Sequence, residues 1–458
     1  MSLLLIGILL YVALQLLIGV FVSRKIHSES DYLLAGRSLG MGLATFSIFA
    51  TWFGAETCIG TAGAAYESGW AGVKADPFGY GVCVLIVGIF FAIRLWKQKL
   101  TTIGDFFRAR YSRSVEKTAV ILMIPTSIMW AAAQIRAFGL VLSASSELTI
   151  TLSVTIAAVV VVTYTAFGGL LADAMTDVVQ GITLIIGLLV IMPFLISDTG
   201  GIEGFMGIIL QERHNETNVN FLEIAETWAI PICGSLVAQE LLSRVIASRS
   251  PQIAQRSSLL AAILYVSVGI IPVLIGLTGF VVLPGLSESE SILPMMAQKY
   301  LTPMLYILFS GALVSAILST VDSTLLAASS LMTHNLIIAS RRDLDEKLKL
   351  RISRWGVIFM GILSYILALY AEGIYDLVKD ASALGSAGIF IVFVFGLFTN
   401  WGGAYSALAS LIVGTAVWIG AHYAWESSTG YLTALGAAFI VYVGIGFFEK
   451  HTKPITPN

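Results

Sequence analysis

Hydroxyl and carboxylate side chains gather in one apolar stretch of the C-terminal half, AILSTVDS (residues 316–323). A charged side chain at membrane depth is costly, so Asp322 is a functional candidate by default. At about 100° per residue of helix, Ser319, Thr320 and Ser323 share one face with Ala316, and Asp322 lies at its edge. Such oxygens are ligands of hard cations. The pattern predicts a cation site, and the alternative is hydroxyls that bond back to their own helix.

Two other apolar stretches contain residues that interrupt helices. Residues 46–63 read FSIFATWFGAETCIGTAG, and residues 230–244 read IPICGSLVAQELLSR. Discontinuous helices at corresponding positions of two halves indicate a substrate site near the bilayer midplane. A pair of kinked packing helices is the alternative, because glycine is common in membrane spans.

Glu56 lies inside the first interrupted stretch. An acidic residue there would favour a cationic or amine-bearing solute, or take up a proton. Arg136 is expected at a similar depth in the fourth span. An ion pair between the two is the preferred interpretation, because a lone buried charge is costly.

Composition restricts the class of protein. The 458 residues are 57% hydrophobic and 12% charged, against about 25% charged in soluble domains. The net charge of −2 does not indicate a nucleic-acid partner. Cys58, Cys83 and Cys233 have no metal-ligand spacing, and the five histidines are scattered. We therefore expect a polytopic all-α membrane protein with no catalytic residues, and not an enzyme.

Spanning-length apolar segments recur along the whole chain. We predict thirteen, over residues 3–22, 40–65, 76–96, 115–143, 148–166, 171–196, 222–247, 252–282, 303–336, 350–371, 374–398, 402–422 and 430–448. Basic residues concentrate in 23–38, 94–117, 244–256 and 341–354, which the positive-inside rule places in the cytoplasm. The N-terminus is then outside and the C-terminus inside. Thr101–Tyr111 and Ile292–Tyr300 are expected to form short interfacial helices.

Several motifs, in this order, resemble the sodium:solute symporter family over nearly the whole chain. They are DYLLAGR (31–37), FGGLLADAMTDVVQ (167–180), STVDS (319–323) and FGLFTNWGGA (395–404). The resemblance implies a leucine-transporter-like (LeuT-like) fold of five-plus-five inverted repeats in one transporter domain, 1–458. Its parts would be an extra N-terminal helix and loop (1–38), the two repeats (39–197 and 220–399), and two C-terminal helices with a short tail (400–458).

The same resemblance implies ion sites for Na+ as the coupling ion. A first site would use the carbonyls of Ala50, Phe53 and Ala316 and the hydroxyls of Ser319 and Thr320. Some family members bind a second sodium, and the matching positions here are Asp177, Ser319, Asp322 and Ser323. For Asp177 the alternative is a carboxylate near a helix N-terminus, stabilised by the helix dipole.

Three aromatic residues, Trp52, Tyr80 and Trp130, have local sequences like those of the high-affinity choline transporters within this family. There the matching residues surround a quaternary ammonium, which aromatic faces attract. The resemblance is incomplete, because this chain has Ala238 where those transporters carry a further Trp before Gln239. The alternative is ordinary aromatic packing. The remaining substrate-binding candidates are Glu56, Gln134, Gln239 and Ser382.

The expected function is sodium-coupled import of a small organic solute across the plasma (inner) membrane by alternating access. The cargo would be choline-like or another amine-bearing cation. The alternatives are a symporter for an amino acid, another zwitterion or a carboxylate, and a sodium-dependent sensor acting with a separate signalling partner. Sodium-dependent accumulation of solute would also distinguish a symporter from a passive channel.

Overall fold

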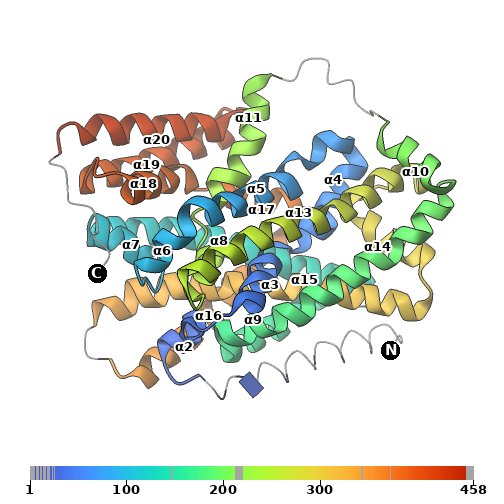
Figure 1. Cartoon of the computed structure of the whole chain (residues 1–458), viewed down its shortest axis with the longest axis horizontal. Coiled ribbons are helices and arrows are strands. Elements are labelled where there is room, and N and C mark those ends of the chain that lie inside the picture. Colours follow the sequence, from blue (N-terminus) through green and yellow to red (C-terminus); the bar gives the residue numbers. More distant parts are fainter. Residues whose placement is uncertain are drawn as a thin grey trace.

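The computed structural model (Figure 1) describes residues 26–449 except 145, 147, 212–219, 342–343 and 372, with a few isolated positions before residue 26. Regular structure in this part is helical, apart from one isolated bridge between Leu39 and Ser248. The α-helices are α2 (Glu29–Leu34), α3 (Met41–Trp52), α4 (Thr61–Ser68), α5 (Tyr80–Ile86), α6 (Ala92–Lys97), α7 (Ile103–Arg110), α8 (Arg113–Ala144), α9 (Ile150–Asp198), α10 (Gly201–Ile209), α11 (Phe221–Ala229), α12 (Gln239–Ala247), α13 (Pro251–Val282), α14 (Ile292–Tyr300), α15 (Pro303–Ser330), α16 (Glu346–Tyr370), α17 (Ile374–Ala383), α18 (Ser386–Phe398), α19 (Ala404–Ile419) and α20 (Gly430–Gly446).

The number of membrane spans differs from the prediction. Among the described residues, seven helices are long and apolar enough to cross a membrane, or up to nine if each of two bent pairs is one span. The count of thirteen is therefore not confirmed. Predicted span 3–22 lies largely outside the described residues. Predicted spans 148–166 and 171–196 join in α9, where only Gly169 leaves helical geometry, with φ 60° and ψ −178°.

Helix interruptions occur at both positions that the sequence indicated. α3 ends at Trp52, and Phe53 follows with φ −90° and ψ 67°. The segment 221–234 and α12 are bent by 46° at their break. A third break, between α17 and α18, bends the chain by 45° inside predicted span 374–398, which we expected to be continuous. Gly385 occupies this break with φ 71°, a conformation that glycine adopts without strain.

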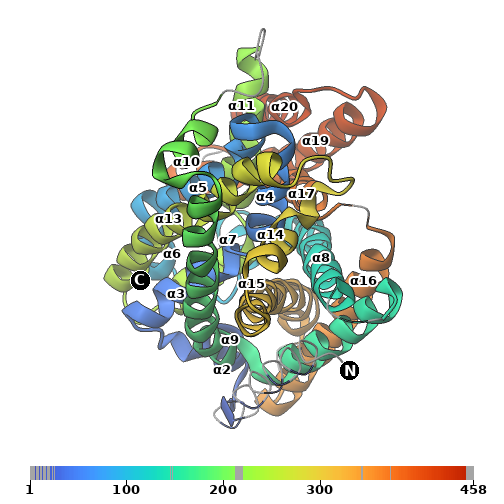
Figure 2. The same cartoon turned by 90° about the vertical axis from the view of Figure 1, so that its right-hand side faces the viewer.

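The helix with the hydroxyl face lies in the interior. α15 packs against α8 and α9 (Figure 2), and also contacts α3. Its residues from Phe309 to Ser330 are all buried. α3 in turn packs against α9 and α13. Because this part of α15 does not reach the surface, its hydroxyls must find hydrogen-bond partners inside the protein.

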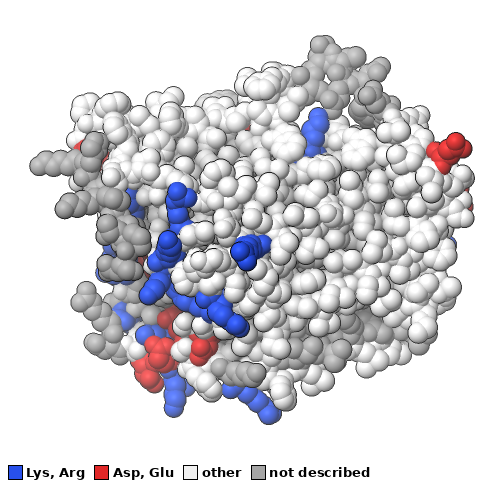
Figure 3. All heavy atoms as spheres, viewed as in Figure 1, with Lys and Arg blue, Asp and Glu red and all other residues white. Residues whose placement is uncertain are grey.

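Charged residues are distributed unevenly over the surface. In Figure 3 most visible Lys and Arg side chains lie at one end of an otherwise weakly charged face, the end where Figure 1 places α6 and α7. Short helices are present at the two positions where interfacial helices were predicted, as α7 and α14. α18, α19 and α20 lie together at one corner of the molecule (Figure 1).

Candidate functional site

The break after α3 meets the hydroxyl face of α15. Ser319 Oγ lies 2.9 Å from the Ala50 carbonyl oxygen, and Thr320 Oγ1 lies 3.3 Å from it. The same hydroxyls lie 2.9 and 3.2 Å from the carbonyl oxygen of Ala316. Phe53 lies at the break itself. The structure thus brings together Ala50, Ala316, Ser319 and Thr320 of the predicted first site, and the back-bonding alternative is present alongside the contact between helices.

The oxygen spacing suits a hard cation. A hydroxyl has one hydrogen, so each of these two can donate to only one carbonyl at a time, and its lone pairs remain available. A cation bound about 2.4 Å from each oxygen, as Ca²⁺ is, would hold oxygens at right angles roughly 3.4 Å apart. The observed separations of 2.9–3.3 Å need to open by only a few tenths of an ångström. These oxygens can therefore serve as one ligand set after a small movement of α3 against α15 and a small rotation of the two hydroxyl side chains away from the Ala316 carbonyl.

Glu56 lies beside this oxygen cluster and is only 2% exposed. Its carboxylate accepts hydrogen bonds from Gln134 Nε2 at 2.6 Å and from Trp130 Nε1 at 3.2 Å. The predicted pair with Arg136 is wrong, since Arg136 instead donates to the carbonyl of Ala368 at 3.4 Å. Trp130 and Gln134 are one helical turn apart on α8. Arg136 is two residues further, which turns its side chain by about 200° to another face.

Gly54 lies at the centre of this arrangement, and its lack of a side chain allows neighbouring side-chain oxygens to approach closely. A Cβ atom there would lie 2.6 Å from Glu56 Oε2, 2.8 Å from Thr320 Oγ1 and 2.9 Å from Gln134 Oε1. The amide of Ala55 next to it donates to Gln134 Oε1 at 2.9 Å. Three side-chain oxygens from three separate elements thus face one glycine.

Gly54→Ala is expected to lower the affinity for sodium about tenfold or more, because the added methyl displaces Thr320 and Glu56 and overpacking costs about 1–3 kcal/mol. Sodium titration of the purified protein, read by its melting temperature, measures this. Gly42→Ala in the preceding helix α3 is the control, because no atom from another part of the fold lies within 4 Å of the added carbon. Equal sodium titrations for the two variants would contradict the placement of the ion beside Gly54.

Among the three predicted cage residues, Trp52 contacts each of the other two. The Trp52 ring centroid is 4.8 Å from that of Trp130 and 5.4 Å from that of Tyr80. These are packing distances for aromatic pairs. The rings therefore form one cluster, but Trp52 contacts both neighbours directly, as the ordinary-packing alternative describes.

The remaining substrate candidates lie around this cluster. Tyr80 Oη lies 2.9 Å from Ser382 Oγ, and Ser235 donates to Ser382 at 3.3 Å. Gln239 borders a small cavity with Trp130 and Ser382, of about 30 Å³. Its Oε1 accepts from the amide of Ile103, which begins α7, at 2.8 Å. Gln239 therefore connects the site to α7, while the hydroxyl of Ser382 is also bonded, to Tyr80, Ser235 and the Val378 carbonyl.

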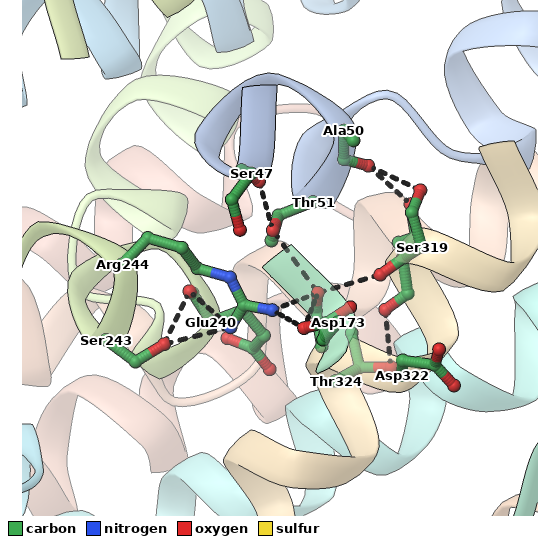
Figure 4. A network of polar contacts seen from close by, with 12 residues as sticks. Ser47, Ala50, Thr51, Asp173, Glu240, Ser243, Arg244, Ser319, Asp322 and Thr324 are labelled. Atoms are coloured by element: carbon green, nitrogen blue, oxygen red, sulfur yellow. Dashed lines mark hydrogen bonds and ion pairs between the residues drawn. The ribbon is translucent and has the colours of Figure 1, made fainter. Parts of the chain in front are cut away.

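A second polar network, deeper along α15, contains residues that the sequence argument missed. Arg244 on α12 forms an ion pair with Asp173 on α9, and both side chains are no more than 2% exposed. Arg244 also donates to Ser323, whose Oγ lies 3.2 Å from Thr51 Oγ1. Figure 4 shows the guanidinium directed from α12 toward Asp173, beside the contact of Ser319 with Ala50.

The predicted second-ion residues do not share one set of contacts. Asp322 accepts from Thr165, while Ser323 contacts Asp173 instead of Asp177. In the described part of the chain, neither carboxylate oxygen of Asp177 has a hydrogen-bond partner, and Asp322 Oδ2 has none. Of these carboxylates only Asp173 contacts the guanidinium of Arg244, so the buried carboxylates of Asp177 and Asp322 have no cation in contact among the described residues, and such burial is costly.

Comparisons of this sequence with those of known proteins agree with one another. The family model for SSF, the sodium:solute symporter family, matches residues 32–414. The chain is 31% identical over 435 residues to high-affinity choline transporter 1 of Drosophila melanogaster, covering 90% of this chain and 70% of that protein. It is 24% identical over 408 residues to the sodium/pantothenate symporter of Haemophilus influenzae, covering 85% of this chain and 84% of that protein.

Among solved structures, a Na+-coupled sialic acid symporter in a substrate-bound outward-open state has a TM-score of 0.88. The match covers 99% of both chains at 20% identity. A likeness at this identity establishes the fold alone, which is the LeuT-like fold expected from the sequence.

Proposed function

The chain belongs to the sodium:solute symporter family, whose members are transporters and not enzymes, and from this premise we propose that it imports a small organic cation together with sodium by alternating access. It is a multi-pass membrane protein. One charge moving inward through 100 mV releases about 2.3 kcal/mol, which is the energy available for accumulating solute. Coupling requires that sodium bind the two conformations differently.

The first sodium is proposed to bind the carbonyls of Ala50, Phe53 and Ala316 with the hydroxyls of Ser319 and Thr320. These oxygens come from a helix break in the first half and from a helix of the second half. An ion between them would hold the two halves together at the break. That supports a role in deciding whether cargo is enclosed.

The observation that carries the cationic cargo is the buried carboxylate of Glu56. In the described part of the chain its hydrogen-bond donors, Trp130 and Gln134, are both neutral. Buried charges are normally paired, and an ammonium of the cargo would supply the missing charge. The neighbouring faces of Trp130 and Tyr80 would favour the same cation. The choline transporter relative agrees with this class of cargo.

A larger cavity, of about 850 Å³, shares Gly72 and Tyr375 with the cavity that Glu56 borders, and we propose it as the approach to this site. Among the described residues it is bordered by one cationic residue, Arg136, and by four carboxylates, Glu67, Glu288, Glu290 and Asp376. A cavity of one charge sign raises the local concentration of the opposite ion. It would therefore attract cations from the outer side.

A second coupling ion is proposed at Asp177, Asp322 and Ser323. Support comes from oxygens of Asp177 and Asp322 that have no hydrogen-bond partner among the described residues, and from the excess of buried carboxylates over Arg244 there. The contact of Ser323 with Asp173 means that this hydroxyl would have to exchange partners. Measuring the charge transported per solute molecule would show whether one or two sodium ions move per cycle.

The domain boundaries and the orientation are further proposals. Repeats over 39–197 and 220–399 fit the interruptions after Trp52 and before Gln239, at corresponding positions of the two units. The basic end of the molecule formed by α6 and α7 is proposed as cytoplasmic, with the N-terminus outside and the C-terminus inside. The membrane would be the plasma (inner) membrane.

Uptake into proteoliposomes tests the proposed function. We expect an inward sodium gradient to accumulate a labelled organic cation above its equilibrium level, and to drive less accumulation in Glu56→Gln protein. Choline, short amines, amino acids and pantothenate are compared under one gradient. If sodium drove accumulation of pantothenate and not of the organic cations, the alternative of a carboxylate symporter, like the sodium/pantothenate symporter relative, would be favoured.

A further inference from the structure

A second buried carboxylate, Asp76, lies near Glu56 and was not expected at the site. Asp76 is 0% exposed and has an extended backbone, with φ −131° and ψ 127°, at the start of the third apolar segment. Its Oδ2 accepts from Thr57 Oγ1 at 2.8 Å, and its Oδ1 accepts from Tyr265 Oη at 2.9 Å. Both donors are neutral. The carboxylate is therefore held in position without a counter-charge from these donors.

Asp76 and Glu56 border the same cavity, of about 210 Å³. Tyr80 and Tyr375 also line it, so aromatic side chains flank both carboxylates. Lys379 borders the cavity as well, but its side chain is exposed, and it interacts electrostatically with Glu226 and Asp380. The volume is below the roughly 300 Å³ at which drug-sized sites begin, which suits a small solute.

Charge balance decides what such a cavity should hold. Each buried, unpaired charge costs several kcal/mol, and two carboxylates that face one small space also repel each other. A solute with one cationic centre would neutralise Glu56 and leave Asp76 unbalanced. A solute with two cationic centres would neutralise both, and the net negative vestibule lined by Glu290 and Asp376 would attract it more strongly than a monocation.

We propose that the cargo carries two cationic nitrogen centres, one held by Glu56 and the other by Asp76, so that the solute class is a short aliphatic diamine. The inference rests on the proposed function, since it specifies the cargo of the same site. Tyr265 and Thr57 fix the position of Asp76, and the distance between the two carboxylates selects the length of the carbon chain between the nitrogens.

Binding to the purified full chain at saturating sodium tests this. The probes are 1,4-diaminobutane, 1-aminobutane with the same chain and one nitrogen, and choline. The wild type should bind the diamine at least tenfold more tightly than the monoamine. Asp76→Asn should weaken diamine binding at least about 30-fold, because one charge of a buried pair is then left unmatched. The same substitution should leave the affinity for the monoamine nearly unchanged. Glu56→Gln should weaken both, and Glu203→Gln on exposed α10 should weaken neither.

A second variant keeps the charge. Asp76→Glu adds one methylene, so the preferred diamine should become shorter across a series from three to six carbons. An unchanged chain-length profile would overturn the inference, including in the case where Asp76→Asn does not fold. Equal wild-type affinity for diamine and monoamine would overturn it while leaving cation symport intact. Sodium-dependent binding of carboxylates without any binding of cations would overturn the proposed function itself.

Discussion

Arg244→Met is expected to lower the free energy of unfolding by about 3–5 kcal/mol, among the largest single-residue effects in this chain. The substitution removes the guanidinium from Asp173, whose side chain is 2% exposed, and leaves that carboxylate buried without its cation. It also removes a donor from Ser323. Thermal and denaturant unfolding of the protein in detergent, without sodium, measures the loss.

The control for that experiment is Arg249→Met, because Arg249 is exposed and, among its described contacts, its side chain donates only a 3.4 Å hydrogen bond to the Ser38 carbonyl. Replacing both members of the ion pair, as Arg244→Met with Asp173→Leu, should recover part of the lost stability, because Asp173 is then no longer buried without its cation. If Arg244→Met were as stable as Arg249→Met, Asp173 would have to be neutral or hydrated in the folded protein.

Both residues of this pair lie in stretches that the sequence analysis singled out, but neither residue was identified as a candidate. Asp173 lies in the FGGLLADAMTDVVQ motif and Arg244 at the end of the second interrupted stretch. Asp173 and Asp177 are one helical turn apart and share a face, so periodicity favours neither as the partner of Ser323. The choice depends on how far α9 is shifted along α15, since a shift of one helical turn, about 5.4 Å, exchanges the two aspartates. Neither segment's sequence determines that shift, because it arises from the packing of the two helices.

Features set by local composition were predicted well. Glycine, proline and polar residues inside apolar spans indicated the interruptions after Trp52 and before Gln239, and both are present. The helical period placed Ser319 and Thr320 on one face, and both approach the Ala50 carbonyl. Such features need only a few consecutive residues, because backbone groups left unpaired in a membrane must find partners nearby.

Features set by rotation and by contacts between helices were predicted poorly. Equal depth suggested a pair of Glu56 with Arg136, but Trp130 and Gln134 occupy the face of α8 that meets Glu56. The i,i+4 spacing of those two residues was the available signal. Asp76 was not selected from the sequence, because a carboxylate at the edge of an apolar segment is expected to reach water. In the structure it is buried and accepts a hydrogen bond from Tyr265.

The double variant Ser319→Ala/Thr320→Val is expected to raise the sodium concentration for half-maximal uptake at least about 100-fold. Each hydroxyl is proposed to contact the ion directly, and a contact to a charged group contributes about 1.5–3 kcal/mol. Either single variant should give at least about a tenfold increase. Uptake by proteoliposomes over a sodium series measures this, with solute binding at saturating sodium as the check that the cargo site survives.

Thr324→Val separates the loss of a ligand from the loss of a buried hydroxyl. Thr324 lies on the same helix, is 1% exposed, and its Oγ1 bonds only to the carbonyls of Thr320 and Val321 among its described contacts. Its substitution should therefore change stability slightly and sodium dependence by less than about twofold, since a neutral hydrogen bond contributes about 1 kcal/mol. If Thr324→Val and the double variant shifted sodium dependence equally, the hydroxyls would be supporting the helix, and the ion would have to bind elsewhere.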